Sequence, residues 1–221
     1  EVIMIIVLGG TGTIGQLLVK QLEQAKQDYV VVARSPEKAK QLFPAHRIRF
    51  GDLDQPQSLP EAFKGGTSLF LLSGHGEGME EQQHTAIDAA TKLGIKRIVK
   101  ISGCEASIAV DAKSETGQEH YRIEQHLKKA SDDHVILRCN FFMQNLLDQV
   151  ATMVKDKNKI MMPFSKDTTF SFIDAQDIAA CAMQALTQYK YSGKTFYLTG
   201  QSSSFLELSQ TLSRYLPKPV T

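Results

Sequence analysis

A glycine-rich segment near the N-terminus has the residue types and spacing of a phosphate-binding loop. Gly9, Gly12 and Gly15 recur in the run Gly-Gly-Thr-Gly-Thr-Ile-Gly, directly after an apolar run and directly before a segment of helical period. A pyrophosphate can approach the backbone only where side chains are absent, and the amides and dipole of a helix N-terminus stabilise its charge. The segment therefore predicts a dinucleotide site. The alternative is a tight strand-to-helix turn without a ligand, but the flanking strand and helix favour binding.

The residues after the second predicted strand indicate which dinucleotide is preferred. An NAD-binding protein would carry Asp or Glu there to hold the ribose 2′-hydroxyl, whereas this chain has Arg34, Ser35 and Lys38 after Ala33. A guanidinium can hold a 2′-phosphate by two hydrogen bonds, and a lysine adds a point charge. We therefore expect NADP(H) to be preferred over NAD(H). The alternative for Arg34 is a solvated surface charge.

Other polar residues follow the third and fourth predicted strands, at the same edge of the expected sheet. Asp52 is placed to border the adenine, although it could equally be a turn residue. His75 lies in a glycine-rich loop that could close over the cofactor or could be a flexible solvated turn. The cofactor-binding residues predicted from these segments are Gly9, Gly10, Thr11, Gly12, Thr13, Ile14, Gly15, Arg34, Ser35, Lys38, Asp52, Leu53, Leu72 and Ser73.

The elements that must position these residues alternate between short β-branched runs and longer segments of helical period. This pattern is typical of βαβ units on a parallel sheet, so the predicted fold class is α/β, a doubly wound Rossmann sheet. Gly94 follows the third predicted helix, where a glycine commonly ends one. The six predicted strands are Ile3–Leu8, Tyr29–Ala33, Arg47–Phe50, Ser68–Leu72, Arg97–Ser102 and Val135–Arg138.

The regular alternation ends after Arg138, and a helix is expected to open at Phe141. Phe170–Ile173 and Thr195–Thr199 predict further strands, with helices over Ala175–Thr187 and Phe205–Leu216. We therefore divide the chain into a dinucleotide-binding domain, residues 1–150, and a small α+β lobe, residues 151–221, that caps the cofactor cleft. The lobe ends without a closing element, which raises the expectation of a longer protein.

The composition of the chain excludes several classes of binding partner. The 221 residues carry 25 Lys and Arg against 24 Asp and Glu, so neither nucleic acid nor a membrane surface is expected as a partner. Three widely spaced cysteines fit neither a disulfide framework nor a zinc site, and the histidines lack metal-ligand spacing. The predicted setting is cytoplasmic and reducing, the predicted partner is a small molecule, and no metal site is proposed.

Motifs in a fixed order resemble those of the NmrA-like family of atypical short-chain dehydrogenases/reductases. They are the glycine loop, Arg34-Ser-Pro, Gly51-Asp-Leu, Arg97-Ile-Val-Lys-Ile-Ser, His120-Tyr-Arg-Ile-Glu, Val135-Ile-Leu-Arg, Phe141-Phe-Met-Gln-Asn, Phe172-Ile-Asp-Ala-Gln-Asp-Ile and Tyr197-Leu-Thr-Gly. The resemblance runs from about Ile3 to the end. It implies either an NADPH-dependent quinone reductase or a protein that binds NADP as a redox sensor. It also implies that Phe142 borders the nicotinamide and that Phe141, Met143 and Asn145 line the substrate cleft.

The usual catalytic residues of short-chain dehydrogenases are incomplete. Those enzymes use a Tyr acid with a Lys four residues later, and a Ser that polarises the carbonyl. Ser102 stands where that Ser and a cofactor contact are expected, but Tyr121 is followed at the required spacing by Gln125. A phenol with a pKa of about 10 is a poor proton shuttle at neutral pH. Ordinary carbonyl reduction is therefore disfavoured, whereas a quinone accepts hydride readily once it is positioned.

His120 is a further candidate acid, one helical turn before Glu124, which could orient it. The alternative is that His120, Tyr121 and Glu124 form a polar helix face beside the cleft. Three functions follow, in decreasing order of support: an NADPH-dependent oxidoreductase for quinone-like or other small electrophiles, a non-catalytic NADP(H) sensor with a protein partner, and a sugar-nucleotide epimerase. The epimerase ranks last because its chemistry also needs the missing Tyr-Lys pair.

Overall fold

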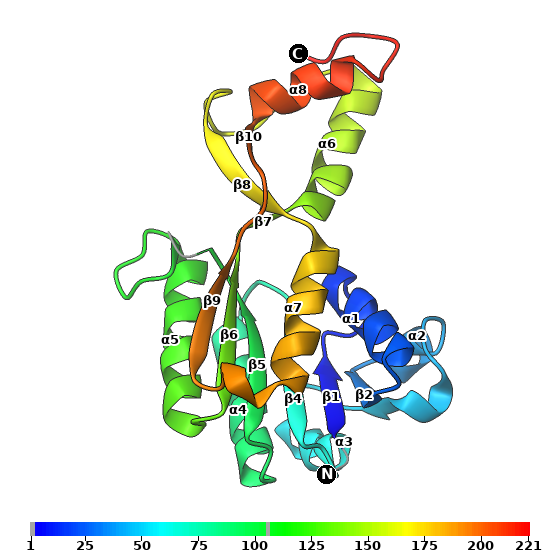
Figure 1. Cartoon of the computed structure of the whole chain (residues 1–221), viewed down its shortest axis with the longest axis vertical. Coiled ribbons are helices and arrows are strands. Elements are labelled where there is room, and N and C mark those ends of the chain that lie inside the picture. Colours follow the sequence, from blue (N-terminus) through cyan, green and yellow to red (C-terminus); the bar gives the residue numbers. More distant parts are fainter. Residues whose placement is uncertain (1–2, 105–106) are drawn as a thin grey trace.

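The computed structural model describes residues 3–104 and 107–221, except for the side chains of residues 147–149 in α6. Figure 1 shows a larger body built around one sheet and a smaller lobe above it. The strands are β1 (Met4–Leu8), β2 (Asp28–Ala33), β3 (Ile48–Phe50), β4 (Ser68–Leu71), β5 (Arg97–Ser102), β6 (His134–Cys139), β7 (Phe141–Phe142), β8 (Thr169–Ile173), β9 (Lys194–Leu198) and β10 (Ser202–Ser204). The helices are α1 (Thr13–Gln24), α2 (Pro36–Ala39), α3 (Leu59–Phe63), α4 (Met79–Lys92), α5 (Glu115–Ala130), α6 (Met143–Lys157), α7 (Ala175–Thr187) and α8 (Phe205–Ser213), with short 3-10 turns η1 (Ala45–Arg47), η2 (Pro56–Ser58) and η4 (Tyr189–Tyr191).

The main sheet is parallel and Rossmann-type, with strand order β3-β2-β1-β4-β5-β6-β9. The α/β fold class and the six predicted strands are confirmed. Side chains of a strand alternate between the two faces of its sheet. In β1, Ile5 and Val7 therefore join the core under α1 and α7, while Ile6 and Leu8 join the core under α3, α4 and α5.

The main sheet has one strand more than the six predicted, and the expected place of Thr195–Thr199 in the lobe is corrected. Strand β9 pairs with β6 as the seventh strand of the main sheet. The preceding helix α7 buries Ile178, Ala179 and Ala182 in the same core as Leu18 and Leu22 of α1, and the two helices lie side by side in Figure 1. Elements beyond residue 150 thus belong to both units. The sequence does not indicate that β9 belongs to the main sheet, because residues 140–174 are inserted between β6 and α7 and so interrupt the β6-α7-β9 crossover.

The lobe contains a three-stranded sheet of order β10-β8-β7, with α6 and α8 beside it. The expected helix opening at Phe141 is corrected, because Phe141 and Phe142 pair with β8 and the helix begins at Met143. Aromatic rings pack together on this sheet: Phe141, Phe164, Phe170, Phe172 and Phe205. Figure 1 shows the lobe on the side of the sheet toward which β1 runs, so it stands near the carboxyl ends of the parallel strands.

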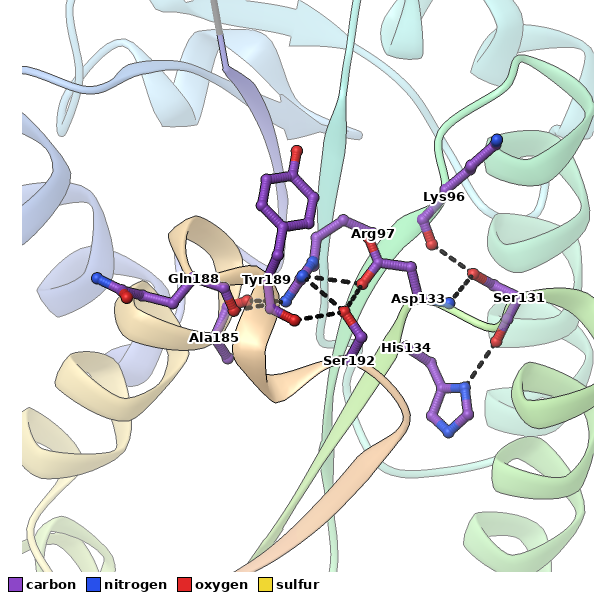
Figure 2. A network of polar contacts seen from close by, with 9 residues as sticks. All are labelled: Lys96, Arg97, Ser131, Asp133, His134, Ala185, Gln188, Tyr189 and Ser192. Atoms are coloured by element: carbon purple, nitrogen blue, oxygen red, sulfur yellow. Dashed lines mark hydrogen bonds and ion pairs between the residues drawn. The ribbon is translucent and has the colours of Figure 1, made fainter. Parts of the chain in front are cut away.

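A buried arginine fastens α7 to the amino end of β5 (Figure 2). Arg97 is 2 % exposed. Its guanidinium donates to the carbonyl oxygens of Ala185 at 2.7 Å and Gln188 at 3.2 Å, and pairs with Asp133 at 2.9 Å. Carbonyls at a helix C-terminus lack partners within the helix. The terminal nitrogens of Arg97 supply these partners, whereas its buried Nε makes no hydrogen bond within the described residues.

None of the helices in the described ranges combines the length and the apolar character that a membrane crossing requires.

Candidate active site

The segments that follow β1, β2, β3 and β4 surround a cavity of about 620 Å³. Carboxyl ends of parallel strands meet at one edge of a sheet, and ligands of this fold class bind there. Nine of the predicted cofactor-binding residues line this cavity: Gly9, Thr11, Arg34, Ser35, Lys38, Asp52, Leu53, Leu72 and Ser73. The glycine-rich loop with His75 also contributes to the wall, through residues 74–77. The sequence analysis did not select Asp54 and Gln82, because nothing in their types marks them.

The glycine loop has the close backbone approaches that its sequence predicts. Gly9 has a φ of +72°, and a Cβ there would lie 2.5 Å from the Leu72 carbonyl oxygen. A Cβ on Gly15 would lie 2.2 Å from the Gly9 oxygen, so any side chain would force α1 away from the loop. Helix α1 starts at Gly12 without a side-chain cap. Its first amides are thus available to an anionic group.

The remaining loop residues support this geometry from behind the cavity wall. A Cβ on Gly10 would meet Val31 at 2.7 Å. Ile14 is buried in the core beneath α1. Gln16 donates to the Thr11 carbonyl oxygen at 2.8 Å and ties the loop to the first turn of the helix. Gly10, Gly12, Thr13, Ile14 and Gly15 therefore shape the loop rather than line the cavity.

Two cations project from the segment after β2. Arg34 and Lys38 are exposed and both border the cavity. Within the described ranges neither has an acidic partner, whereas the neighbouring Lys40 is paired with Glu37 at 2.6 Å. A pair of unneutralised cations at a cavity rim provides the charge that a phosphate requires.

Asp52 combines the two roles considered for it. It lines the cavity, and its carboxylate accepts hydrogen bonds from the Asp54 amide at 3.2 Å and the Gln55 side chain at 3.1 Å. Its own amide donates to the Ser58 hydroxyl at 2.9 Å. Asp52 therefore holds the turn after β3 in place while it borders the site.

A buried ion pair joins β5, α5 and β6 at the carboxyl edge of the sheet. Glu124 is fully buried, and Arg138 donates to both of its carboxylate oxygens, through Nε at 3.0 Å and a terminal nitrogen at 2.5 Å. The Ser102 hydroxyl donates to the same carboxylate at 2.7 Å. The hydroxyl of this catalytic candidate is therefore already engaged, and three residues from separate predicted motifs form one cluster.

Lys100 was not selected from the sequence, although a lysine between Val99 and Ile101 in a buried strand is itself a signal. The strand pleat turns Lys100 to the same side as Ser102, and its side chain is completely buried. Its ammonium donates to the Gln83 side-chain oxygen at 2.7 Å and lies 3.2 Å from Nδ1 of His120. Gln83 in turn donates to Ser73 at the cavity wall, at 2.9 Å. A polar chain thus leads from the cavity to His120.

Burial strongly shifts the pKa values of Lys100 and His120. Burial lowers the pKa of Lys100 to about 7, although the Glu124 carboxylate nearby acts in the opposite direction. Burial also lowers the pKa of His120 to about 3, helped by the adjacent Lys100 and His75. The candidate acid His120 therefore has a neutral imidazole at physiological pH, because a buried site without a carboxylate partner disfavours the imidazolium.

The other predicted residues lie apart from the cofactor cavity. Tyr121 is half-buried on α5. Phe142 packs against the core beneath α1 and α7. Phe141 joins the aromatic cluster of the lobe, and Met143 lines a second, largely apolar cavity of about 890 Å³ between α6 and α8. The assignment of Phe141, Met143 and Asn145 to a substrate cleft stays a prediction.

The fold and the cavity define a Rossmann-type protein with an open dinucleotide-sized site. The chain belongs to the NmrA-like family, whose model matches residues 3–221. It is 33% identical to an NAD(P)H azoreductase of Xenophilus azovorans over 219 residues, which covers 98% of this chain and 75% of the relative. Quinone oxidoreductase 2 of Escherichia coli is 25% identical over 223 residues, with 99% and 76% covered. The crystal structure of Citrobacter sp. triphenylmethane reductase complexed with NADP(H) superposes with a TM-score of 0.87 at 25% identity and covers 99% of this chain and 78% of that one.

Proposed function

We propose that this protein is an NADPH-dependent oxidoreductase that reduces small quinone-like electrophiles. The observation that carries the proposal is the cavity that extends from the glycine loop before α1 to Arg34 and Lys38, two cations without an acidic partner among the described residues. The relatives named as an azoreductase and a quinone oxidoreductase support the same class of acceptor.

The residues present fit the dinucleotide. A backbone cradle that a Cβ at Gly9 or Gly15 would fill suits the pyrophosphate, and the amides at the start of α1 suit its charge. Arg34, Ser35 and Lys38 would hold the 2′-phosphate, which gives the preference for NADP(H) over NAD(H). Leu53 and Leu72 would cover the apolar adenine side of the site. When bound, the reduced nicotinamide supplies the hydride.

The protein's own residues have three tasks in such a reaction. They orient the two reactants, which can account for much of the rate of a hydride transfer to an activated ring. The Ser102-Glu124-Arg138 cluster holds α5 and the carboxyl ends of β5 and β6 together. The protein's residues also return one proton to the acceptor oxygen, and His120 at the end of the polar chain from Ser73 is the group suited to that task.

The test is oxidation of NADPH, followed at 340 nm, with a panel of benzoquinones and naphthoquinones. We expect turnover with NADPH and a much larger KM with NADH. Arg34→Ala should weaken NADPH binding by roughly 10- to 100-fold, the loss of one or two charge-assisted hydrogen bonds, and should change NADH binding little. Lys40→Ala is the matched control, because Lys40 is an exposed cation at the other end of α2 that pairs with Glu37.

A different result would favour the sensor function. If NADP⁺ and NADPH bind tightly and no acceptor is reduced, the enzyme proposal is contradicted. A sensor must then bind the two redox states with different affinity, because a ligand shifts an equilibrium only through differential binding. Calorimetric titration with each form measures that difference directly.

A further inference from the structure

His120 is buried and uses only one of its two ring nitrogens. The side chain is 4 % exposed, and its Nδ1 lies 3.2 Å from the Lys100 ammonium. In the described part of the chain, Nε2 makes no hydrogen bond. That edge of the ring lies beside Gly103, where a Cβ would stand 3.4 Å from Nε2. Among the described residues, Nε2 does not belong to the fully buried nitrogens that lack a partner. It therefore keeps some access from outside the protein interior and is a candidate for contact with a ligand.

The position of His120 connects it with the cofactor cavity. Gly103 immediately follows β5 at the carboxyl edge of the sheet. The exposed ring of His75, which lines the cavity, packs edge-on against the His120 ring with centroids 5.8 Å apart. The free nitrogen therefore lies at the border between the protein interior and the loop that closes the cavity.

Lys100 is held so that it must face His120. Gln83 from α4 accepts one of its protons at 2.7 Å and the Ile101 carbonyl oxygen a second at 3.2 Å, which leaves the third directed at Nδ1 of His120. The other ionisable groups around the pair are His75 beside the His120 ring, Glu124 on α5 and Cys139 on β6. Glu124 is engaged by Arg138 and Ser102, and Cys139 is a buried thiol, so neither accepts a proton from Lys100.

We propose that Lys100 and His120 form a proton relay that replaces the missing Tyr-Lys pair. Lys100 donates to Nδ1 and so keeps the His120 proton on Nε2, where it is given to the oxygen of the acceptor after hydride transfer. His120 is the catalytic residue of this pair and Lys100 its positioning residue. The relay rests on the proposed function.

The proton balance explains why the lysine is needed. The acceptor takes up a hydride, which leaves a negative charge on its oxygen. An O–H bond forms there as the Nε2–H bond of His120 breaks, and Nδ1 takes a proton from Lys100, which becomes a neutral amine. Without that second transfer the ring would become an imidazolate, which is far too basic at neutral pH. Water then protonates Nε2, Nδ1 returns its proton to Lys100, and one proton is consumed per turnover.

The lowered proton affinities are consistent with this cycle. A His120 pKa of about 3 keeps the ring neutral, so that Nδ1 is free to accept. A Lys100 pKa of about 7 lets the ammonium release its proton at a modest cost near neutral pH.

The first test does not depend on turnover. Protein labelled with ¹⁵N-histidine and saturated with NADP⁺ is studied by NMR through the two-bond couplings of the imidazole rings, and His120→Gln identifies the signals. We expect His120 to carry its proton on Nε2 from pH 8 to pH 5 without titrating. In Lys100→Met the preference for Nε2 should weaken and the pKa of His120 should rise. A ring protonated on Nδ1, a wild-type pKa near 6.5, or an unchanged spectrum in Lys100→Met would overturn the proposal.

The second test measures the pH profile of kcat with a benzoquinone. The wild-type rate should fall above about pH 7, as Lys100 loses its proton. Lys100→Met should lower kcat by roughly 100-fold and abolish this step, while the KM for NADPH stays within about twofold. The matched control Lys96→Met removes an exposed lysine just before β5 and should behave as wild type.

The two tests separate the relay from the proposed function. Wild-type kcat and an unchanged pH step in Lys100→Met would sink the relay while leaving the reductase intact. No turnover with any acceptor would contradict the reductase and its proton transfer together, and the NMR measurement would still decide whether Lys100 sets the proton position on His120.

Discussion

Strand β5 carries a buried cation near each end, and the two are surrounded differently. Arg97 at the amino end pairs with the Asp133 carboxylate and with carbonyl oxygens of α7 and the following turn (Figure 2). Lys100, three residues on, bonds to neutral groups of Gln83, Ile101 and His120 and to no carboxylate within the described ranges. The first arrangement neutralises the charge, and the second leaves it able to change.

The difference matches the division of labour in parallel sheets. Ligands bind at the carboxyl ends of the strands, and the amino ends serve stability. An arginine keeps its charge at any ordinary pH and its planar fork can bond several oxygens at once, whereas a buried lysine changes its pKa readily. Arg97 therefore suits a permanent structural role, and Lys100 suits a role in proton transfer.

The largest loss of stability should come from replacing Arg97 at the amino end of β5. Arg97→Leu leaves two carbonyl oxygens without this donor and leaves the Asp133 carboxylate with the Ser192 hydroxyl but without its cation. We expect a loss of about 3–5 kcal/mol in the free energy of unfolding. Urea denaturation measures it. The affinity of the folded variant for NADPH should be unchanged, and a large loss of affinity would remove the contrast between the two ends. Arg122→Leu, which breaks the partly exposed pair with Glu80, should cost less than about 1 kcal/mol.

A smaller loss of stability, together with a change in activity, is expected at the carboxyl end. Glu124→Gln keeps an acceptor for Ser102 but removes the charge that faces Arg138, and should cost about 2–3 kcal/mol. The same change should move the pKa of Lys100 further down, because Glu124 now raises it. The step in the pH profile of kcat should therefore shift to lower pH. A step that stays at the wild-type pH would show that Glu124 does not act on Lys100.

The pH dependence of the protein's stability should also reveal the lowered pKa of Lys100. Folding lowers the pKa of Lys100 from 10.5 to about 7. Between these values the unfolded chain binds a proton that the folded chain has lost, so stability rises with pH across this window. The stability of wild type minus that of Lys100→Met should grow by on the order of 1 kcal/mol per pH unit between pH 7 and 10. Urea denaturation at several pH values would reveal a flat difference if Lys100 were paired like Arg97.

The smallest change in stability is expected from His120, below pH 7. Its pKa falls from 6.5 in the unfolded chain to about 3 in the folded protein. As the pH falls through this window, only the unfolded chain gains the proton, and stability is lost. Thermal unfolding at pH 7, 6 and 5 should show that wild type loses up to about 1 kcal/mol per pH unit more than His120→Asn. Equal losses would mean that His120 titrates normally in the folded state.

Much of the fold was predictable because its signals are local. The apolar runs and glycine punctuation placed six strands within a residue or two, and the run from Gly9 to Gly15 defined a strand, a loop and a helix together. Gly94, with a φ of +81°, ends α4 as predicted. Such features depend on neighbours in the chain, so they can be recognised without a structure.

The predictions that failed involve residues far apart in the chain. Strand β9 joins the main sheet through pairing with β6, some 60 residues earlier, across an inserted lobe. No local pattern distinguishes that pairing from membership of the lobe. Ser102 looked like a polarising hydroxyl, but only the packing of α5 against β5 and β6 directs it to Glu124.

The sequence by itself thus determined the fold class, the loop from Gly9 to Gly15 and the cations that follow β2, because periodicity and backbone freedom are properties of short segments. Tertiary structure alone decided which polar groups meet at the end of β5. The pleat turns Lys100 toward α5, the rotation of that helix brings His120 within 3.2 Å, and shared burial sets the proton affinity of both.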